Sequence, residues 1–185
     1  VITDKAWQDA RIDRTGLFTE IHRQGFGFNW VLSGRLELNH STISDADQNF
    51  EDLYPENETW QLNPGISLGA SKKLTESLSS GLWLGRVQRS GSMTEKFINF
   101  FPVGQDPFEM LGNPMLDPEV NYQADLNVQW KSEKSLLRVD LFIARLQNLI
   151  SSEIDTILSP KVANSPGVRR FNNLKKALKT GFEAQ

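Results

Sequence analysis

The strongest constraint on the fold is a strict alternation of apolar and polar residues in separate segments. Residues 122–130 read YQADLNVQW, residues 30–39 read WVLSGRLELN, and residues 136–144 repeat the pattern with two interruptions. Successive side chains of a β-strand point to opposite faces, so this alternation predicts long strands with one apolar and one polar face. Helices are not indicated in these segments.

Weaker alternation elsewhere raises the expected total to about seven strands, nearly all longer than the ~5–6 residues usual in soluble sheets. The connections alternate in length: they are short at 24–27, 75–76 and 131–134, and long at 40–59, 89–121 and 151–168. Short turns on one rim and long loops on the other are typical of outer-membrane β-barrels. The expected strands are residues 16–24, 30–39, 62–74, 77–88, 122–130, 136–144 and 170–183.

A soluble ligand-binding β-barrel or β-sandwich protein is the alternative, because its strands also alternate between an apolar core and a polar surface. Alternation alone does not say which face meets lipid, water or a core. Structureless loops beyond ~12–15 residues are uncommon in compact domains, which favours the barrel of a membrane. The sequence contains no run near the ~20 apolar residues that a membrane-spanning helix requires.

Composition and motifs exclude several other function classes. The net charge of −3 argues against a nucleic-acid partner, and the absence of cysteine excludes disulfides, a cysteine-based zinc site and a thiol nucleophile. The segment Ser90-Gly91-Ser92 approaches, but does not form, the Gly-x-Ser-x-Gly motif of a hydrolase. We therefore predict no enzyme, no catalytic residue and no cofactor. An outer-membrane hydrolase would need catalytic side chains that no spacing here indicates.

A resident metal site is not predicted either. His22 and His40 have no local ligand spacing, and the acidic residues of 45–52 lack the spacing of a calcium loop. The thioethers of Met93, Met110 and Met115 suit Cu(I), but three methionines in one long loop are more often flexible apolar filler.

The segment that leads into the strand 122–130 carries a resemblance to a known family. It contains Arg89 and Glu95 and ends in GNPMLDPE at 112–119. This resembles the late-barrel region of TonB-dependent outer-membrane receptors, as do SGRL at 33–36, NPGISL at 63–68, QNLI at 147–150 and KTGFE at 179–183. Gly and Asn tolerate positive φ and Pro restricts it, so the motif makes a stiff exit from a loop. Its matching residues are Gly112, Asn113, Pro114, Leu116, Pro118 and Glu119.

The resemblance implies an all-β fold: a segment of an antiparallel up-and-down β-barrel, part of a larger transmembrane barrel. Residues 1–185 form one region without a domain boundary, and we expect the plug domain and the C-terminal strand to lie outside this chain. The implied function is uptake of a scarce nutrient, such as a siderophore-like metal chelate, across the bacterial outer membrane. The implied partners are outer-membrane lipid, the nutrient ligand and, through the plug, the TonB complex.

Strand polarity predicts the orientation of individual residues in such a barrel. Apolar residues such as Leu36, Leu38, Leu126, Val128, Val139 and Leu141 are expected to face lipid. Loops on a rigid scaffold concentrate binding residues, so the loop 89–121 is expected to touch the nutrient through Arg89, Glu95 and Asp106. The residues expected to face the lumen are Arg35, Glu37, Arg86, Gln88, Gln123, Asp125, Arg138 and Asp140.

Overall fold

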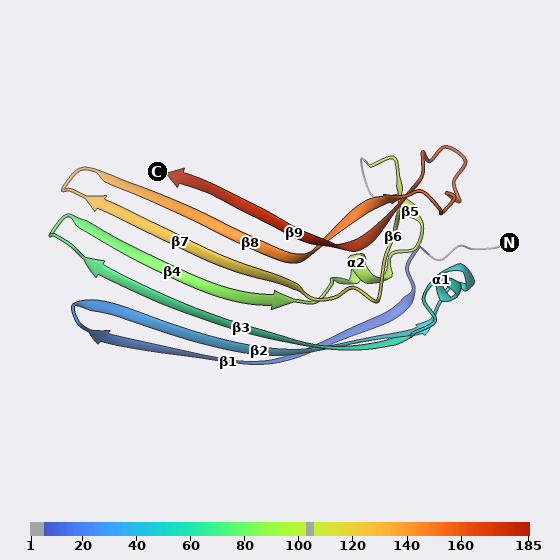
Figure 1. The fold of residues 1–185 in the computed structure, drawn as a ribbon, viewed down its shortest axis with the longest axis horizontal. Helices are drawn as coiled ribbons and strands as arrows, with labels where there is room; N and C mark the ends of the chain where they lie inside the picture. The colour runs from blue at the N-terminus through green and yellow to red at the C-terminus, as the bar shows by residue number, and fades with distance from the viewer. Residues whose placement is uncertain (1–5, 103–105) are drawn as a thin grey trace.

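A computed structural model describes residues 6–102 and 106–185 as one curved sheet with small helices at one end (Figure 1). The sheet has nine strands in the order β1-β2-β3-β4-β7-β8-β9-β6-β5. Neighbours pair antiparallel, except that β6 and β9 are parallel. The elements are β1 (Asp9–Gly25), β2 (Phe28–Asp45), α1 (Gln48–Leu53), β3 (Glu58–Lys73), β4 (Leu78–Arg89), α2 (Met93–Phe97), β5 (Phe101–Pro102), β6 (Glu109–Leu111), β7 (Glu119–Lys131), β8 (Leu136–Asp155) and β9 (Val168–Ala184).

The predicted all-β fold with seven long strands is confirmed. The strands run further than the alternation indicated, and β8 continues to Asp155 instead of ending at residue 144. The strand β8 stays paired with β9 along this extension, although residues 145–155 do not alternate cleanly. Two short strands, β5 and β6, were not predicted, because elements of two and three residues are too short to show a period.

Short turns join the long strands at the end of the sheet opposite the helices (Figure 1). The turn between β1 and β2 is Phe26-Gly27, with φ of 55° and 76°. Two consecutive positive φ values match the twist of a two-residue hairpin, and glycine adopts such a value at little cost. At the other end lie α1, α2 and the long loops, as the alternating loop lengths predicted.

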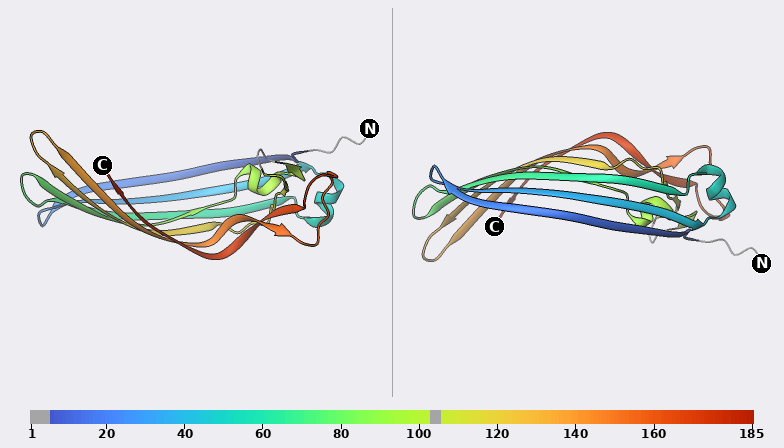
Figure 2. Two further views of the ribbon diagram at one scale, coloured as in Figure 1. Left: turned by 90° about the horizontal axis from the view of Figure 1, so that it is seen from above. Right: turned by 90° about the horizontal axis from the view of Figure 1, so that it is seen from below.

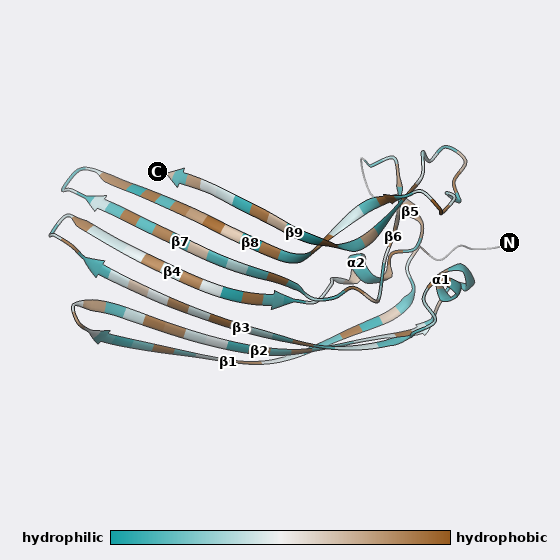
Figure 3. Cartoon of the chain, viewed as in Figure 1, coloured by the Kyte–Doolittle hydropathy of each residue, from teal (hydrophilic) through white to brown (hydrophobic). Residues whose placement is uncertain are grey.

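The two faces of the sheet differ in polarity, which appears in Figure 3 as bands of hydrophobic and hydrophilic residues along each strand. We call the face with Leu36, Leu126 and Leu141 the outer face, and the opposite face with Asp125 and Asp140 the inner face. Because the long strands form a single layer, their leucines stay partly exposed; Leu126 and Leu141 retain 38% and 45% of their accessible surface. Among the described residues, the cluster of buried apolar side chains lies at the loop end, around Phe50, Leu111 and Val168.

Two tryptophans lie on the outer face near the turns. Trp30 and Trp130 both lie near the turn end of their strands, and Trp130 pairs with Leu78 at the start of β4. The indole nitrogen of Trp30 donates to the carbonyl oxygen of Gly25 over 3.2 Å. Aromatic side chains with one apolar and one polar part are enriched where a barrel meets the membrane surface.

Candidate ligand-facing loop and the two faces of the sheet

Residues 90–102 and 106–118, between β4 and β7, fold back over the inner face of the sheet; we call them the inner loop. Its helix α2 begins with a capping box in which the Ser92 hydroxyl accepts from the backbone N–H of Glu95 and the Glu95 carboxylate accepts from that of Ser92. Figure 2 shows α2 between the β1 and β2 side of the sheet and the β8 and β9 side. A β-bridge joins Trp7 to Ile98, and β6 pairs with β9. The inner loop therefore connects both sides of the sheet at its loop end.

Arg89 fastens the start of the inner loop to its end. Its guanidinium lies 2.9 Å from Oε2 of Glu95 and 3.1 Å from Oε1 of Glu119. Glu119 also accepts a hydrogen bond of 3.0 Å from the backbone N–H of Ile150 on β8. The Arg89 side chain keeps 45% of its surface exposed, so it reaches the surface of the loop while both carboxylates are mostly covered. The structure thus brings two of the three predicted ligand contacts, Arg89 and Glu95, into one ion pair.

Lys96 is the residue of the inner loop that sequence reasoning missed. It lies on α2 with no exposed surface, and its ammonium donates to Oγ of Ser41 at 3.0 Å and Oγ1 of Thr59 at 3.1 Å. Its side-chain partners in the described part of the chain are uncharged. Burial, aided by the positive charge of Arg14, lowers the pKa of Lys96 to about 8. A single lysine in a polar loop carries no sequence signal for such burial.

Gly112, the first residue of the family motif, packs directly against α2. A Cβ atom at this position would lie 2.5 Å from the backbone carbon of Lys96 and 2.6 Å from the backbone nitrogen of Phe97. From the sequence, Gly112 and Asn113 are explained by their tolerance of positive φ, but neither residue has a positive φ in the structure. That interpretation is corrected: the glycine is required by the close approach of two backbone segments, which only a residue without a Cβ permits.

The rest of the motif anchors the end of the inner loop. Pro114 is buried, and Leu116 is fully buried while its carbonyl oxygen accepts from the Gln61 side chain over 2.6 Å. The backbone of Asp117 and the side-chain amide of Asn173 exchange two hydrogen bonds, of 2.8 and 2.9 Å. The motif therefore ties the loop to β3 and β9, while Pro118 precedes the first residue of β7, Glu119.

Asp106 lies apart from Arg89 and Glu95. It accepts from the guanidinium of Arg169 on β9 at 3.0 Å and from the backbone N–H of Phe108. Nearby, the fully buried Glu109 accepts from the backbone N–H groups of Lys161 and Val162, which holds the loop between β8 and β9 against β6. The three predicted ligand contacts are thus divided between two attachment points, and their contact with a ligand stays a prediction.

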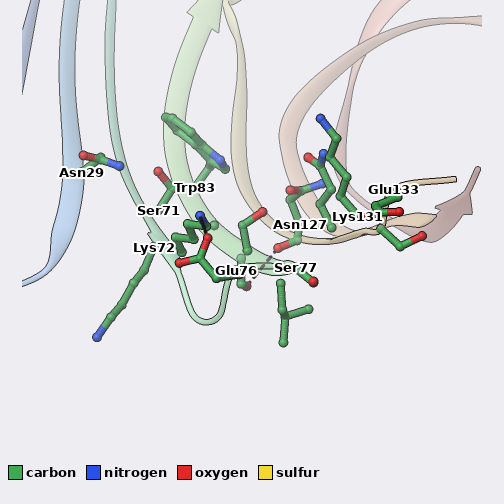
Figure 4. A pocket seen from close by; sticks show the side chains of 16 residues that line it. Asn29, Ser71, Lys72, Glu76, Ser77, Trp83, Asn127, Lys131 and Glu133 are labelled. Atoms are coloured by element: carbon green, nitrogen blue, oxygen red, sulfur yellow. Dashed lines mark hydrogen bonds and ion pairs between the residues drawn. The ribbon is translucent and has the colours of Figure 1, made fainter. Parts of the chain in front are cut away.

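The inner face carries six of the residues that were predicted to face the lumen. The strand register places on it Arg35 and Glu37, which pair with each other, and Gln123, which donates to Asp125. The Arg138 guanidinium lies 2.7 Å from the Asp140 carboxylate. This face is hollowed near the turns, where polar side chains such as Asn29, Ser71 and Asn127 border an open space of about 760 Å³ (Figure 4).

The prediction that Arg86 and Gln88 face the same way is wrong. Arg86 pairs with Ile66 on β3 and with Tyr122 on β7, both of which lie on the outer face. The residues of β4 on the inner face include Trp83 and Arg89, because Trp83 pairs with Asp125 and Arg89 with Glu119. The error arose because a polar residue type was taken as a sign of the polar face, although Arg86 and Gln88 alternate in step with Leu82 and Leu84 of the same strand. Consequently, an arginine lies on the apolar side of the sheet.

The histidines and methionines do not assemble a site in the described residues. His22 lies beside Glu20 on the inner face, whereas His40 stacks on Trp60 on the outer face. Met110 is nearly buried, and Met93 and Met115 remain exposed. Among residues 6–102 and 106–185, no group of three or more His, Cys, Asp or Glu is placed to hold a metal ion. Within the same ranges, no helix is long and apolar enough to cross a membrane.

Comparison with known families decides among the fold alternatives. A family profile described as "TonB dependent receptor-like, beta-barrel" matches residues 4–185. The chain belongs to this family. TonB-dependent receptors are outer-membrane proteins of bacteria, and the soluble ligand-binding alternative is not favoured. A search of curated protein sequences gives no match.

Several solved TonB-dependent receptors share the fold. The copper transporter OprC matches with a TM-score of 0.73 and 15% identity over 95% of this chain. The hemophore receptor HasR of Serratia marcescens gives 0.63 and 17% over 94%, and the siderophore receptor PirA of Pseudomonas aeruginosa gives 0.58 and 16% over 95%. The chain spans 26%, 31% and 39% of those three structures. At sequence identities of 15–17%, this similarity shows a shared fold and nothing about the ligand.

Proposed function

We propose that this chain forms part of the wall and outer loops of a receptor that imports a scarce nutrient across the outer membrane. In this proposal the nutrient is a metal chelate of the siderophore type, and transport uses energy that TonB delivers through a plug domain. The observation that carries the proposal is the inner loop, which folds over a polar inner face instead of projecting away from the sheet. Such a loop lies where a solute entering the barrel from the loop end would pass.

The polarity of the inner face supports the same proposal. Its side chains carry both charges and amides, as in Arg138, Asp140 and Asn127, and the open hollow near the turns offers a polar surface to a plug. A face that packed a hydrophobic core would not place these groups together. The solved structures with a similar fold include a copper transporter, a siderophore receptor and a hemophore receptor.

Within the inner loop, we assign the first contact with the nutrient to Arg89, Glu95 and Asp106. Arg89 is the most exposed of the three side chains, at 45%, and its fork of N–H donors suits carboxylate or catecholate oxygens of a chelate. Glu95 and Asp106 pair with Arg89 and Arg169, respectively, in the unliganded loop. Binding of a ligand to these carboxylates would compete with the two ion pairs.

The test is uptake by the full-length receptor, plug included, in cells that lack their own chelate receptors. Labelled iron and copper chelates are supplied to cells with and without a functional TonB, and the receptor is compared with a variant lacking residues 98–109. We expect TonB-dependent uptake that the deletion reduces at least tenfold while the barrel still assembles. Uptake that persists without TonB would refute the coupling to TonB. Unchanged uptake after the deletion would show that residues 98–109 of the inner loop do not take part in binding the nutrient.

A further inference from the structure

Three basic side chains form an unusual group on the outer face. Arg86 on β4, Tyr122 on β7 and Arg145 on β8 are direct neighbours across the sheet. The Arg86 guanidinium lies 5.8 Å from the centre of the Tyr122 ring. Lys176 on β9 pairs with Gln147, two residues beyond Arg145 toward the loop end. We call Arg86, Tyr122, Arg145 and Lys176 the outer basic row.

On β4, β7 and β8, the outer basic row lies at the loop-end border of the leucine-rich part of the outer face. On the turn side of Arg86 and Arg145, the next cross-strand neighbours are Leu84, Ala124 and Ile143, followed by Leu82, Leu126 and Leu141. In this family the loop end faces the outside of the cell. A basic side chain on the lipid side of a barrel costs least near the headgroups, so we infer that the row lies close to the headgroups of the outer leaflet.

The charges of the row are not neutralised by the protein. Within the described ranges, the side chains of Arg145 and Lys176 form no hydrogen bond or ion pair, and the Arg86 side chain donates only to the carbonyl of Pro64 and the side chain of Gln88. The row's neighbours toward the loop end, Gln88, Val120 and Gln147, are uncharged as well. On the inner face, by contrast, Arg35 and Arg138 each pair with a carboxylate. The outer basic row thus presents positive charge to the membrane.

A shallow, open hollow lies on the turn side of these cations on the same face. Its volume is about 560 Å³, its walls include Leu68, Leu84, Ala124 and Ile143, and Arg86 and Arg145 also line it. Hydrocarbon fits such a surface, and arginine binds phosphate through paired N–H donors. Basic pockets at the membrane surface bind anionic lipid headgroups by this combination.

We propose that the outer basic row binds the phosphate group of a phosphorylated lipid in the outer leaflet, with an acyl chain of that lipid in the hollow below. Arg86 and Arg145 flank the phosphate, Lys176 adds charge from the loop side, and the Tyr122 ring holds the Arg86 guanidinium in place. The site is distinct from the route of the nutrient, because it lies on the opposite face of the sheet.

The experiment is native mass spectrometry of the full-length receptor in mild detergent, with bisphosphorylated lipid A or its dephosphorylated form added as the probe. We expect the phosphorylated probe to remain bound at least tenfold more than the dephosphorylated one. The double substitution Arg145→Gln and Lys176→Gln should remove that preference. The matched control is Lys179→Gln on the same strand, whose side chain lies on the inner face over the Phe142 ring.

Four outcomes decide the proposal, provided that each variant shows the heat-resistant migration of an assembled barrel. Loss of the preference in the double variant alone supports it. Equal retention of both probes by the unsubstituted receptor, or equal loss in the Lys179→Gln control, overturns it. Full displacement of the lipid by millimolar inorganic phosphate also overturns it, because the acyl chain would then contribute nothing.

Discussion

The Nζ atom of Lys96 lies 3.0 Å from the Oγ atom of Ser41, a residue 55 positions earlier on β2. This contact anchors the inner loop to the sheet through a buried cation whose side-chain partners, among the described residues, are hydroxyl and amide groups. Because the ammonium has lost its water without gaining a carboxylate, its charged form is disfavoured in the docked loop.

Docking of the inner loop is expected to strengthen as pH rises from 8 to 10.5. In that range Lys96 of an undocked loop, with the ordinary pKa of 10.5, is still protonated, whereas the docked residue, with a pKa of about 8, is neutral. The undocked state thus binds more protons, so docking gains up to about 3 kcal/mol across the range and none of this gain is present below pH 8. The measurement is chymotrypsin cleavage near Phe97 and Phe100 in the purified full-length receptor, normalised to an unfolded substrate.

The control for this prediction is Lys96→Met, which keeps an unbranched side chain and removes the titrating group. Cleavage of the unsubstituted loop should slow at least tenfold between pH 7.5 and 10, while cleavage of the variant should change little. Parallel pH profiles for the two proteins would contradict the role of the buried ammonium.

Arginine should be tolerated on the inner face and rejected on the outer face. Leu126 lies on the outer face between Leu82 and Leu141, so Leu126→Arg is expected to cost about 2–4 kcal/mol if it reaches the middle of the bilayer. Gln123→Arg, three residues earlier on the same strand and on the inner face, would lie beside Asp125 and cost little. The cost of each substitution is measured as the fraction of assembled, heat-resistant receptor in outer membranes. Equal amounts for the two variants would contradict the assignment of the faces.

Gly112→Ala is expected to detach the inner loop from the sheet. The added Cβ would lie 2.5 Å from the backbone carbon of Lys96, and its three nearest atoms all belong to the backbone, so no flexible side chain can move away. We expect chymotrypsin cleavage near Phe97 to accelerate at least tenfold, with barrel assembly unaffected. Gly25→Ala is the matched control, since a Cβ there meets nothing within 4 Å. Slow cleavage in Gly112→Ala would show that the loop does not depend on this close approach.

The chain by itself should not behave as a soluble monomer. Its outer face exposes large apolar side chains, including Leu17 at 78% and Phe182 at 73%, and β1 has one neighbour, β2, in the described sheet. Exposed apolar patches and open strand edges promote association with other chains. Size-exclusion chromatography with light scattering, in buffer and in detergent, should show aggregates only in buffer. A sharp monomer in buffer that unfolds cooperatively would contradict a membrane-facing outer surface.

The sequence by itself determined the seven long strands, their alternating faces and the position of the long loops. These features depend on local periodicity, and a side chain that points to one face of a strand does so whatever the neighbouring strand. The motif at 112–119 also indicated the family, since its glycine and prolines follow one another in a fixed order. Leu126, Asp125 and Asp140 lie on the faces that their position in the alternation predicted.

Only the tertiary structure decided how segments far apart in the chain meet. The register of β4 against β7 placed Arg86 beside Tyr122, and a shift by one residue would have reversed its face. The burial of Lys96, the separation of Asp106 from Arg89 and the need for Gly112 all follow from the path of one loop across the sheet. That path is set by contacts such as Asp117 with Asn173, which are 56 residues apart and leave no periodic trace in the sequence.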